Sequence, residues 1–277
     1  MTPKDSVCIG RRTVLKGVGA STLLFGGVSG VGSAKPNKTV FALDFSTGSG
    51  DADDIGVNTA GWQVDRYEPD VWEVTTFDGD GRLHINIDES GPSSGFYNEQ
   101  GKKYLPEQGG HWGTGHNSTL SYSFYVDPDW EDDGGKRQQT GMWGVVGDAN
   151  SNIIAYPVLE YQDSDAATNP NEGGPPGDGA QFRMFLQTGE WENLGLPRQT
   201  QIDPDEGGWV DVEFQFLFKG GNPRVKYYVN NALIGVDDTI DLYGDPALFL
   251  EPILNSENFG DDEDYYYDNI ALIEPGR

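Results

Sequence analysis

The chain has 277 residues, of which 45 are acidic and 18 are basic, and its formal net charge at neutral pH is −27. Such an excess of negative charge repels polyanions, so nucleic acid and anionic membrane surfaces are not expected as partners. The single cysteine, Cys8, excludes an intramolecular disulfide and a thiolate metal site.

Residues 1–34 resemble a twin-arginine export signal. Arg11 and Arg12 stand directly before a glycine-rich apolar run, and small residues ending at Ala34 form a cleavage site of the kind that signal peptidases use. The run is too polar and too short to match the ~20 apolar residues of a membrane span. We expect export out of the cell, cleavage after Ala34 and no stable membrane insertion afterwards. Retention of the segment as an anchor is the open alternative.

The segment that remains after cleavage, residues 35–277, is even more acidic. It keeps 14 basic and 44 acidic residues, because residues 1–34 remove four bases and one acid, and its net charge is −30. Like-charge repulsion of this size destabilises a compact state at low ionic strength, and molar salt shortens the Debye length to ~3 Å. The composition therefore predicts a salt-adapted protein.

Residues 35–277 are expected to form one all-β domain. Many runs alternate apolar and polar residues with period two, and no run after Ala34 has convincing helical periodicity. The pair Asn230-Asn231 predicts a tight hairpin turn. In chain order, the main predicted strands are 40–45, 83–87, 120–126, 142–146, 153–161, 182–187, 209–218, 225–229, 232–236, 248–254 and 265–273. About a dozen strands of this kind suggest two packed antiparallel sheets.

Two segments interrupt this rhythm, and both are expected to be long loops: Asn98–Asn117 and Gln162–Ala180. Long loops on a rigid β scaffold are common places for binding residues. The composition of the second loop also fits a solvated acidic surface.

Three segments carry a family resemblance. GGWVDVEFQF (207–216), VKYYVNNALIGV (225–236) and DYYYDNIALIE (264–274) resemble the last third of concanavalin A-like lectin/glucanase domains, which are LamG-like jelly rolls. Further segments, among them FYNEQGKKY and GMWGVVGDAN, are similar to uncharacterised secreted jelly-roll proteins. The resemblance implies a concanavalin A-like jelly-roll sandwich of two antiparallel sheets, and it brings no defined activity.

The residues leave enzymatic activity open. Glucanases of this fold place two carboxylates on one strand face, whereas Glu160 and Asp163 are an odd number of residues apart and would point to opposite faces. A carboxylate pair assembled from two strands stays open. A polysaccharide lyase needs amide, cationic and proton-transferring groups, and side chains of these types are supplied by Tyr97, Asn98, Gln100, Lys103, His111, His116, Tyr156 and Arg183.

Carbohydrate recognition requires aromatic faces for sugar rings and polar groups for hydroxyls. The predicted carbohydrate-binding residues are Tyr97, Asn98, Gln100, Lys103, Tyr156, Glu160 and Arg183. Glu160 and Arg183 fit a plain cross-strand ion pair equally well. The adjacent Lys102 and Lys103 are expected to balance either Glu160 or a carboxylate of the ligand.

Structural calcium is a further expectation, since many domains of this fold hold the ion with Asp carboxylates and backbone carbonyls. Asp268 is placed by the alternation on the apolar face of its strand, so it should be buried and need a partner. Asp44 lies near the start of the domain and could share the ion with it; alternatively, Asp268 simply accepts backbone N–H bonds.

Taken together, the sequence predicts a secreted, salt-adapted, carbohydrate-recognising jelly-roll domain whose partner is an extracellular polysaccharide or glycan. Two alternatives remain: an extracellular polysaccharide lyase or glycoside hydrolase, and a structural or adhesive cell-surface domain.

Overall fold

The computed structural model describes residues 36–46, 50–51, 61–93, 98–106, 110–115, 117–130, 138–163, 180–218, 222–240, 247–258 and 262–276. All of them belong to the compact unit formed by residues 35–277. The predicted export segment, residues 1–34, lies outside the described residues, as does most of the predicted loop 162–180.

The first sheet contains nine of the strands that the structure describes, and they pair antiparallel. Its order is β16-β15-β14-β8-β18-β5-β4-β2, and β1 pairs with β18. The strands are β1 (Lys38–Leu43), β2 (Gly50–Asp51), β4 (Val71–Phe77), β5 (Asp80–Asn86), β8 (Ser118–Val126), β14 (Gly208–Leu217), β15 (Arg224–Val229), β16 (Ala232–Asp237) and β18 (Asp264–Glu274).

The second sheet also contains nine described strands in antiparallel pairs, in the order β13-β12-β11-β9-β17-β6-β3, with β10 on β9 and β7 on β17. Its strands are β3 (Gly61–Val64), β6 (Glu99–Leu105), β7 (Thr114–Gly115), β9 (Gln138–Gly147), β10 (Ile153–Ala155), β11 (Val158–Asp163), β12 (Gln181–Phe185), β13 (Trp191–Gly195) and β17 (Leu248–Glu257).

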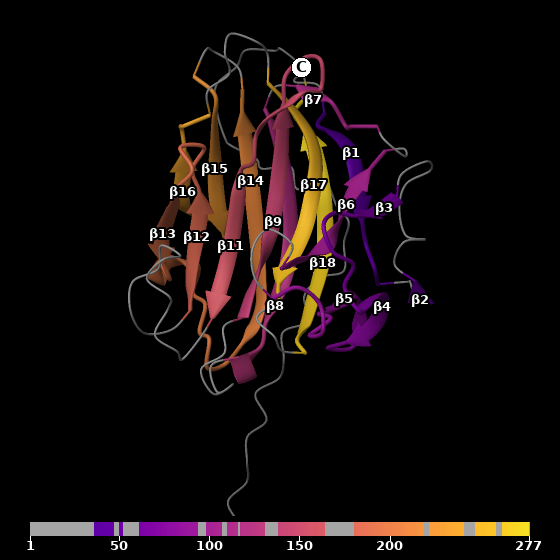
Figure 1. Ribbon diagram of the computed structural model, residues 1–277. Helices are drawn as coiled ribbons and strands as arrows, with labels where there is room; N and C mark the ends of the chain where they lie inside the picture. The colour runs from indigo at the N-terminus through magenta and orange to yellow at the C-terminus, as the bar shows by residue number, and fades with distance from the viewer. Residues whose placement is uncertain are drawn as a thin grey trace, which may run out of the picture. The chain divides into compact units, whose positions relative to one another are not determined.

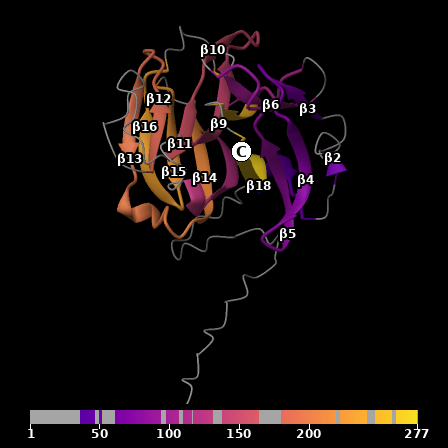
Figure 2. The same ribbon diagram turned by 60° about the horizontal axis from the view of Figure 1, so that its bottom comes forward.

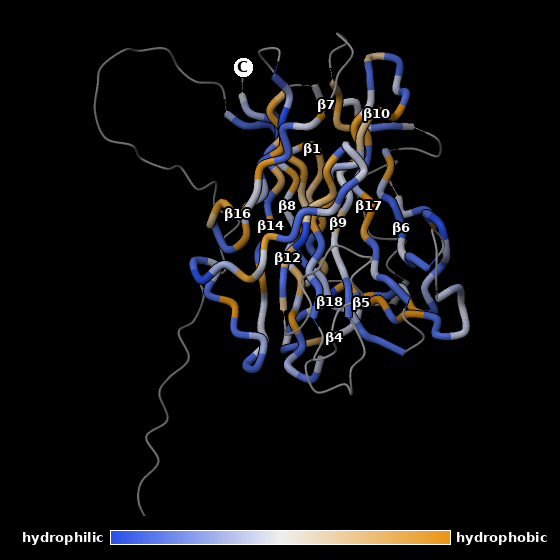
Figure 3. Tube along the Cα trace, turned by 60° about the vertical axis from the view of Figure 1, so that its left-hand side comes forward, coloured by the Kyte–Doolittle hydropathy of each residue, from blue (hydrophilic) through white to orange (hydrophobic). Residues whose placement is uncertain are grey.

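The two sheets pack face to face, as Figures 1 and 2 show. Period-two alternation sends one side chain in two toward the facing sheet, so aromatic rings of the two sheets meet in a shared core. The ring of Phe124 on β8 lies 5.5 Å from that of Tyr161 on β11, and Phe216 on β14 lies 5.1 Å from Phe249 on β17. Figure 3 shows the hydrophobic stretches along the strands. The predicted all-β jelly-roll sandwich is confirmed.

The predicted hairpin at Asn230-Asn231 is also confirmed, and it joins β15 to β16. Both residues have positive φ, 47° and 66°, which matches the two left-handed positions of a type I′ turn. Asn tolerates this conformation better than most residues do.

The prediction of a loop over Asn98–Asn117 is wrong. Residues 99–105 form β6, which pairs with β17 on one side and with β3 on the other. The sequence EQGKKYL does not show the apolar–polar alternation of a typical strand, because polar residues occupy both of its faces. The inward-facing Lys102 lies over the ring of Trp72 and 3.5 Å from a carboxylate oxygen of Glu68, so its charge is compensated.

Other differences are smaller. The segment predicted as one strand over 153–161 is divided into β10 and β11, and strands β3, β4 and β13 were not among the main predicted strands. Along β18, the register shifts between Asp268 and Ala271 around Asn269, whose φ is 55°. Because of this bulge, Asp268 lies on the outer face beside Arg82, and not on the apolar face of Ile270 and Leu272 where the simple alternation placed it.

Among the described residues, no helix is long and apolar enough to cross a membrane.

Candidate functional site

The outer face of the second sheet carries a cavity of about 580 Å³, which we call the groove. Strands β6, β9, β10, β11, β12, β13 and β17 contribute side chains to it, and four further lining residues lie between strands. The cavity is lined by Asp65, Arg66, Asn98, Glu99, Lys103, Trp143, Ile153, Tyr156, Val158, Phe185, Trp191, Glu251 and Ile253. The groove therefore combines four aromatic residues, Trp143, Tyr156, Phe185 and Trp191, with charged groups of both signs.

A buried ion pair lies next to the residues that line the groove: Glu160 of β11 and Arg183 of β12 face each other in register. The Nε and Nη2 atoms of Arg183 both lie 2.9 Å from Oε2 of Glu160. Only 2% of the Glu160 side chain and 7% of that of Arg183 are exposed. The structure thus contains the cross-strand ion pair that was one of the two interpretations of these residues.

Further donors hold Glu160 in place. Gln139 Nε2 donates to Oε2 at 3.1 Å, and the indole N–H of Trp143 donates to Oε1 at 3.3 Å. Gly141 lies opposite Glu160 on β9, and a Cβ at this position would come within 2.8 Å of the Glu160 side chain. Only glycine leaves room for the carboxylate here.

A ladder of amide groups continues from Glu160 across four strands. Asn193 donates to Gln181, Gln181 to Gln162 at 3.0 Å, and Gln162 to Gln139 at 2.6 Å, and Gln139 donates to Glu160. Each amide both donates and accepts, so its orientation is fixed by its neighbours. The ladder makes this half of the outer face polar and rigid.

Two arginines lie against tryptophan rings in the groove. The guanidinium of Arg183 lies 4.0 Å from the ring centre of Trp191, and that of Arg66 lies 4.0 Å from that of Trp143. Arg66 also donates to Asp65 at 2.7 Å. These contacts orient the indole rings and keep the two cations in place.

Glu99 and Glu257 face each other in register across β6 and β17. Burial, and then the carboxylates of Glu160 and Glu257, raise the pKa of Glu99 well above its usual range, although Arg66 and Arg183 oppose the shift. Glu257 accepts a hydrogen bond from Asn98 and lies 3.8 Å from Nη2 of Arg183. Two neighbouring carboxyl groups thus have different environments.

The other end of the groove holds Glu251 between two basic side chains. Lys103 Nζ lies 3.8 Å from one of its oxygens, and His111 Nδ1 lies 3.2 Å from the other. The expectation that Lys103 balances Glu160 is therefore wrong, because Glu251 of the adjacent strand is nearer. Tyr156 lies at the rim with 39% of its surface exposed, and burial raises the pKa of its phenol.

The structure separates the predicted carbohydrate-binding residues into groups. Lys103, Tyr156 and Asn98 line the groove, and Glu160 and Arg183 form a buried ion pair beside it. Gln100 does not belong to it: this side chain is fully buried on the inward side of β6, where it donates to the carbonyl of Asp88 and accepts from the Asp88 N–H. Tyr97 and His116 lie outside the described residues.

Sequence reasoning missed several groove residues, namely Arg66, Glu99, Trp143, Trp191 and Glu251, and also Glu257 opposite Glu99. Glu99 lay within the segment interpreted as a loop. Trp143 and Val145 are two residues apart and therefore share one strand face, as do Glu257 and Asn255. This period of two could have placed Trp143 and Glu257 on an outer face. The pairing of β6 with β17, which brings Glu99 to Glu257, joins segments that are far apart in sequence.

The predicted calcium residues do not form a fitting calcium site. Asp268 is buried as expected, but its partner is the Arg82 guanidinium, which is a poor neighbour for a cation. Asp44 accepts from the N–H of Ser46 at 2.9 Å. No group of three or more potential metal ligands occurs in the described part of the chain. Calcium therefore stays a prediction that these side chains do not support.

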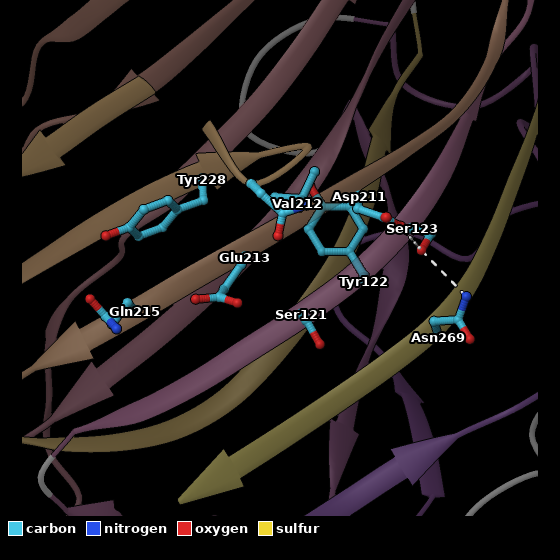
Figure 4. Close-up of a pocket in the computed structure, with 10 residues that line it drawn as sticks. Ser121, Tyr122, Ser123, Asp211, Val212, Glu213, Gln215, Tyr228 and Asn269 are labelled. Carbon is cyan, nitrogen blue, oxygen red and sulfur yellow. Dashed lines mark hydrogen bonds between the residues drawn. The ribbon is translucent and has the colours of Figure 1, made fainter. Parts of the chain in front are cut away.

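A second cavity, of about 510 Å³, lies on the outer face of the first sheet (Figure 4). Ser121 and Ser123 of β8 form its floor beside Asp211 and Glu213 of β14, and Tyr228 of β15 stands at one side. Its lining consists mainly of hydroxyl, amide and carboxylate groups. It lacks the paired aromatic and cationic contacts of the groove, which makes the groove the stronger candidate.

No family model matches the sequence, and no curated protein matches it significantly. Solved structures do match. A variant of alginate lyase Aly36B in complex with alginate trisaccharide has a TM-score of 0.52 and 14% identity, over 88% of this chain and 99% of that chain. A second Aly36B variant, in complex with alginate tetrasaccharide, has a TM-score of 0.50 and 12% identity over 87% and 97%.

Alginate lyase vAL-1 from Chlorella virus has 14% identity and a TM-score of 0.46 over 78% of this chain and 93% of that chain, a likeness too loose to carry an argument. At these identities the matches concern the fold alone. The chain therefore shares the two-sheet jelly-roll fold with the Aly36B alginate lyase.

Proposed function

We propose that the chain recognises an extracellular polysaccharide in the groove of its second sheet. The observation that carries the proposal is the position of Trp143, Tyr156 and Trp191 around a cavity that is also lined by charged side chains of both signs. Aromatic faces cover the apolar side of sugar rings, and fixed polar groups pair with hydroxyls. A jelly-roll neighbour that was solved with bound alginate oligosaccharides supports a polysaccharide as the type of partner.

Replacement of rim aromatics should weaken binding without unfolding the protein. Tyr156→Ala and Trp191→Ala each remove a ring that lines the groove. We expect each to weaken binding by roughly tenfold or more, equivalent to ~1.4 kcal/mol, with little change in melting temperature. Affinity electrophoresis in molar salt, on a polysaccharide chosen from a glycan array, measures the effect.

Tyr228→Ala is the matched control, since Tyr228 is a partly exposed tyrosine on the other sheet. It should bind as the wild type does. Equal binding by all three variants and the wild type would place the site elsewhere. An absence of glycan binding by the wild type would favour the structural or adhesive alternative.

Cleavage of the bound polysaccharide is the second candidate function. The observation that favours it is the Glu99 carboxyl group, which lines the groove opposite Glu257 and whose pKa is raised by burial. Release of reducing ends, or absorbance of an unsaturated product, distinguishes hydrolysis or elimination from binding alone.

We also propose that residues 1–34 direct export through the twin-arginine pathway and are cleaved after Ala34. The paired arginines and the small residues before position 35 support this proposal. Replacing Arg11 and Arg12 together with lysine should leave the protein inside the cell. N-terminal sequencing of secreted wild-type protein should begin at Lys35; an intact N-terminus on the secreted protein would instead indicate a retained segment.

A further inference from the structure

The second cavity, of about 510 Å³, lies on the outer face of the first sheet, whereas the groove lies on the outer face of the second sheet. Small-molecule sites occupy ~300–1,000 Å³, and one water molecule takes up only ~30 Å³ of liquid volume. The second cavity is therefore large enough for a small organic ligand, and it lies on the opposite face of the sandwich from the groove.

Strand register builds this cavity. Ser123 of β8 faces Asp211 of β14. In the next outward row, Ser121 of β8 faces Glu213 of β14, and Glu213 faces Tyr228 of β15. Figure 4 shows Glu213 between Tyr228 and Ser121. The small serine side chains leave space above β8, and because paired strands hold all of these residues, the space is preformed.

Two asparagines with positive φ bring amide groups to the cavity. Asn231, with φ of 66°, belongs to the turn between β15 and β16, and Asn269, with φ of 55°, lies at the bulge of β18. Bulges redirect side chains, and the Nδ2 atom of Asn269 lies 3.4 Å from Ser123 Oγ, as the dashed line in Figure 4 marks. Together with Gln215 of β14, these amides both donate and accept hydrogen bonds.

The lining carries negative charge. Asp211 and Glu213 are its carboxylates, and no lysine, arginine or histidine is among its described residues. Asp211 accepts a hydrogen bond from the Ser123 hydroxyl at 2.7 Å. The Glu213 side chain has no hydrogen-bond or ion-pair partner within the described ranges, and burial raises the pKa of its carboxyl group. A partly buried carboxylate thus faces the cavity without a cation.

More deeply buried carboxylates of this chain do have cations beside them. The pairs are Glu160 with Arg183, Asp268 with Arg82 and Glu251 with Lys103. Such pairing offsets part of the cost of taking a charge out of water. Glu213 differs because it borders a space that a ligand can enter, so its cation can come from the ligand.

We propose that the second cavity binds an amino sugar with a free amino group, which enters as the ammonium ion. Glu213 and Asp211, two residues apart on one strand face, accept hydrogen bonds from the ammonium group. Hydrogen bonds between an ammonium and a carboxylate are roughly twice as strong as neutral ones. The sugar hydroxyls pair with the serine hydroxyls and with the amides of the lining.

Other classes of ligand use this lining less completely. Two carboxylates repel an anionic sugar such as a uronate. A neutral sugar leaves Glu213 without a cation. An inorganic cation or a simple aliphatic amine leaves most of the hydroxyl and amide groups unused, and a quaternary ammonium has no N–H to donate. Among these classes, an amino sugar is the one that matches both the charge and the hydrogen-bonding groups.

Isothermal titration calorimetry of the secreted protein in molar sodium chloride tests the proposal. The probes are glucosamine, glucose, N-acetylglucosamine and ethanolamine. Glucose and N-acetylglucosamine keep the sugar without the ammonium, and ethanolamine keeps the ammonium without the sugar ring. We expect glucosamine to bind roughly tenfold or more tightly than each of the others. The contact should persist in salt because partly buried charge pairs are screened much less than exposed ones.

Glu213→Gln should weaken glucosamine binding by roughly tenfold or more. It should not lower the melting temperature, because the carboxylate has no partner to lose within the described structure. Ser121→Leu keeps both carboxylates but fills the space above β8, so it should weaken binding as well. Glu192→Gln is the matched control, since Glu192 is an exposed carboxylate on β13 of the second sheet. It should bind glucosamine as the wild type does.

Several results would overturn the inference. Equal affinity for glucosamine and a sugar without the ammonium would show that the carboxylates do not select the ligand, and equal affinity for ethanolamine would show that the sugar is not recognised. Absence of glucosamine binding would leave the cavity to inorganic cations of the medium. Unchanged binding by both Glu213→Gln and Ser121→Leu would place the ligand elsewhere. None of these results decides polysaccharide binding in the groove, which the rim variants test separately.

Discussion

At low ionic strength, the segment 35–277 is expected to lose its cooperative fold. Its net charge is −30, and the cations that are buried in the described structure are already paired: Arg82 with Asp268, Lys102 with Glu68 and Arg183 with Glu160. The excess negative charge therefore lies mainly where solvent ions can screen it. The Debye length grows from ~3 Å in 1 M salt to ~30 Å in 0.01 M salt, so repulsion between distant carboxylates increases strongly on dialysis.

Circular dichroism melting after stepwise dialysis measures this effect. The melting transition should move to lower temperature as salt is removed, and the folded signal should disappear at the lowest ionic strength. Sucrose in place of salt is the control, because it stabilises folded proteins by exclusion from their surface and does not screen charge. An unchanged cooperative melt at low salt would contradict salt adaptation.

Arg183→Met should destabilise the protein by about 3–5 kcal/mol, because it leaves the buried Glu160 carboxylate without its cation. Gln139 and Trp143 would remain as its donors, and neither carries a charge. Urea denaturation at constant molar sodium chloride measures the free energy of unfolding without adding a charged denaturant. A loss below ~1 kcal/mol would indicate that water or a neighbouring cation compensates the carboxylate.

Two further variants make this result interpretable. Arg183→Met combined with Glu160→Leu removes both charges and should recover much of the loss, because an isolated buried charge is the main cost. Lys38→Met is the exposed control: its pair with Glu274 spans 3.8 Å, and 73% of the lysine side chain is exposed. It should change stability by no more than ~1 kcal/mol.

Much of the fold could be predicted because its information is local. Val210, Val212, Phe214 and Phe216 alternate with polar residues along β14, and the structure buries all four. A strand with one buried and one solvated face can be recognised from this alternation. The Asn230-Asn231 turn is equally local, since its geometry depends on two residues that tolerate positive φ.

Strand β6 could not be recognised by the same reasoning. Its outward Glu99 and Lys103 line a polar groove, and its inward Gln100 and Lys102 are buried. Gln100 is satisfied by the backbone of Asp88, and Lys102 by Glu68 and the ring of Trp72. These partners come from other segments, so the pattern within 99–105 carries no apolar face to read.

The sequence by itself determined the two-sheet architecture, the acidity of the surface and the type of residue available for binding, because alternation and composition are properties of the chain. Only the tertiary structure decided which residues meet. It formed ion pairs between Arg183 and Glu160, between Arg82 and Asp268 and between Lys103 and Glu251. It also placed Glu99 opposite Glu257. Pairing between distant strands fixes these neighbours, and neighbours set the charge state of a buried group, so the chemistry of the groove depends on sheet order and register.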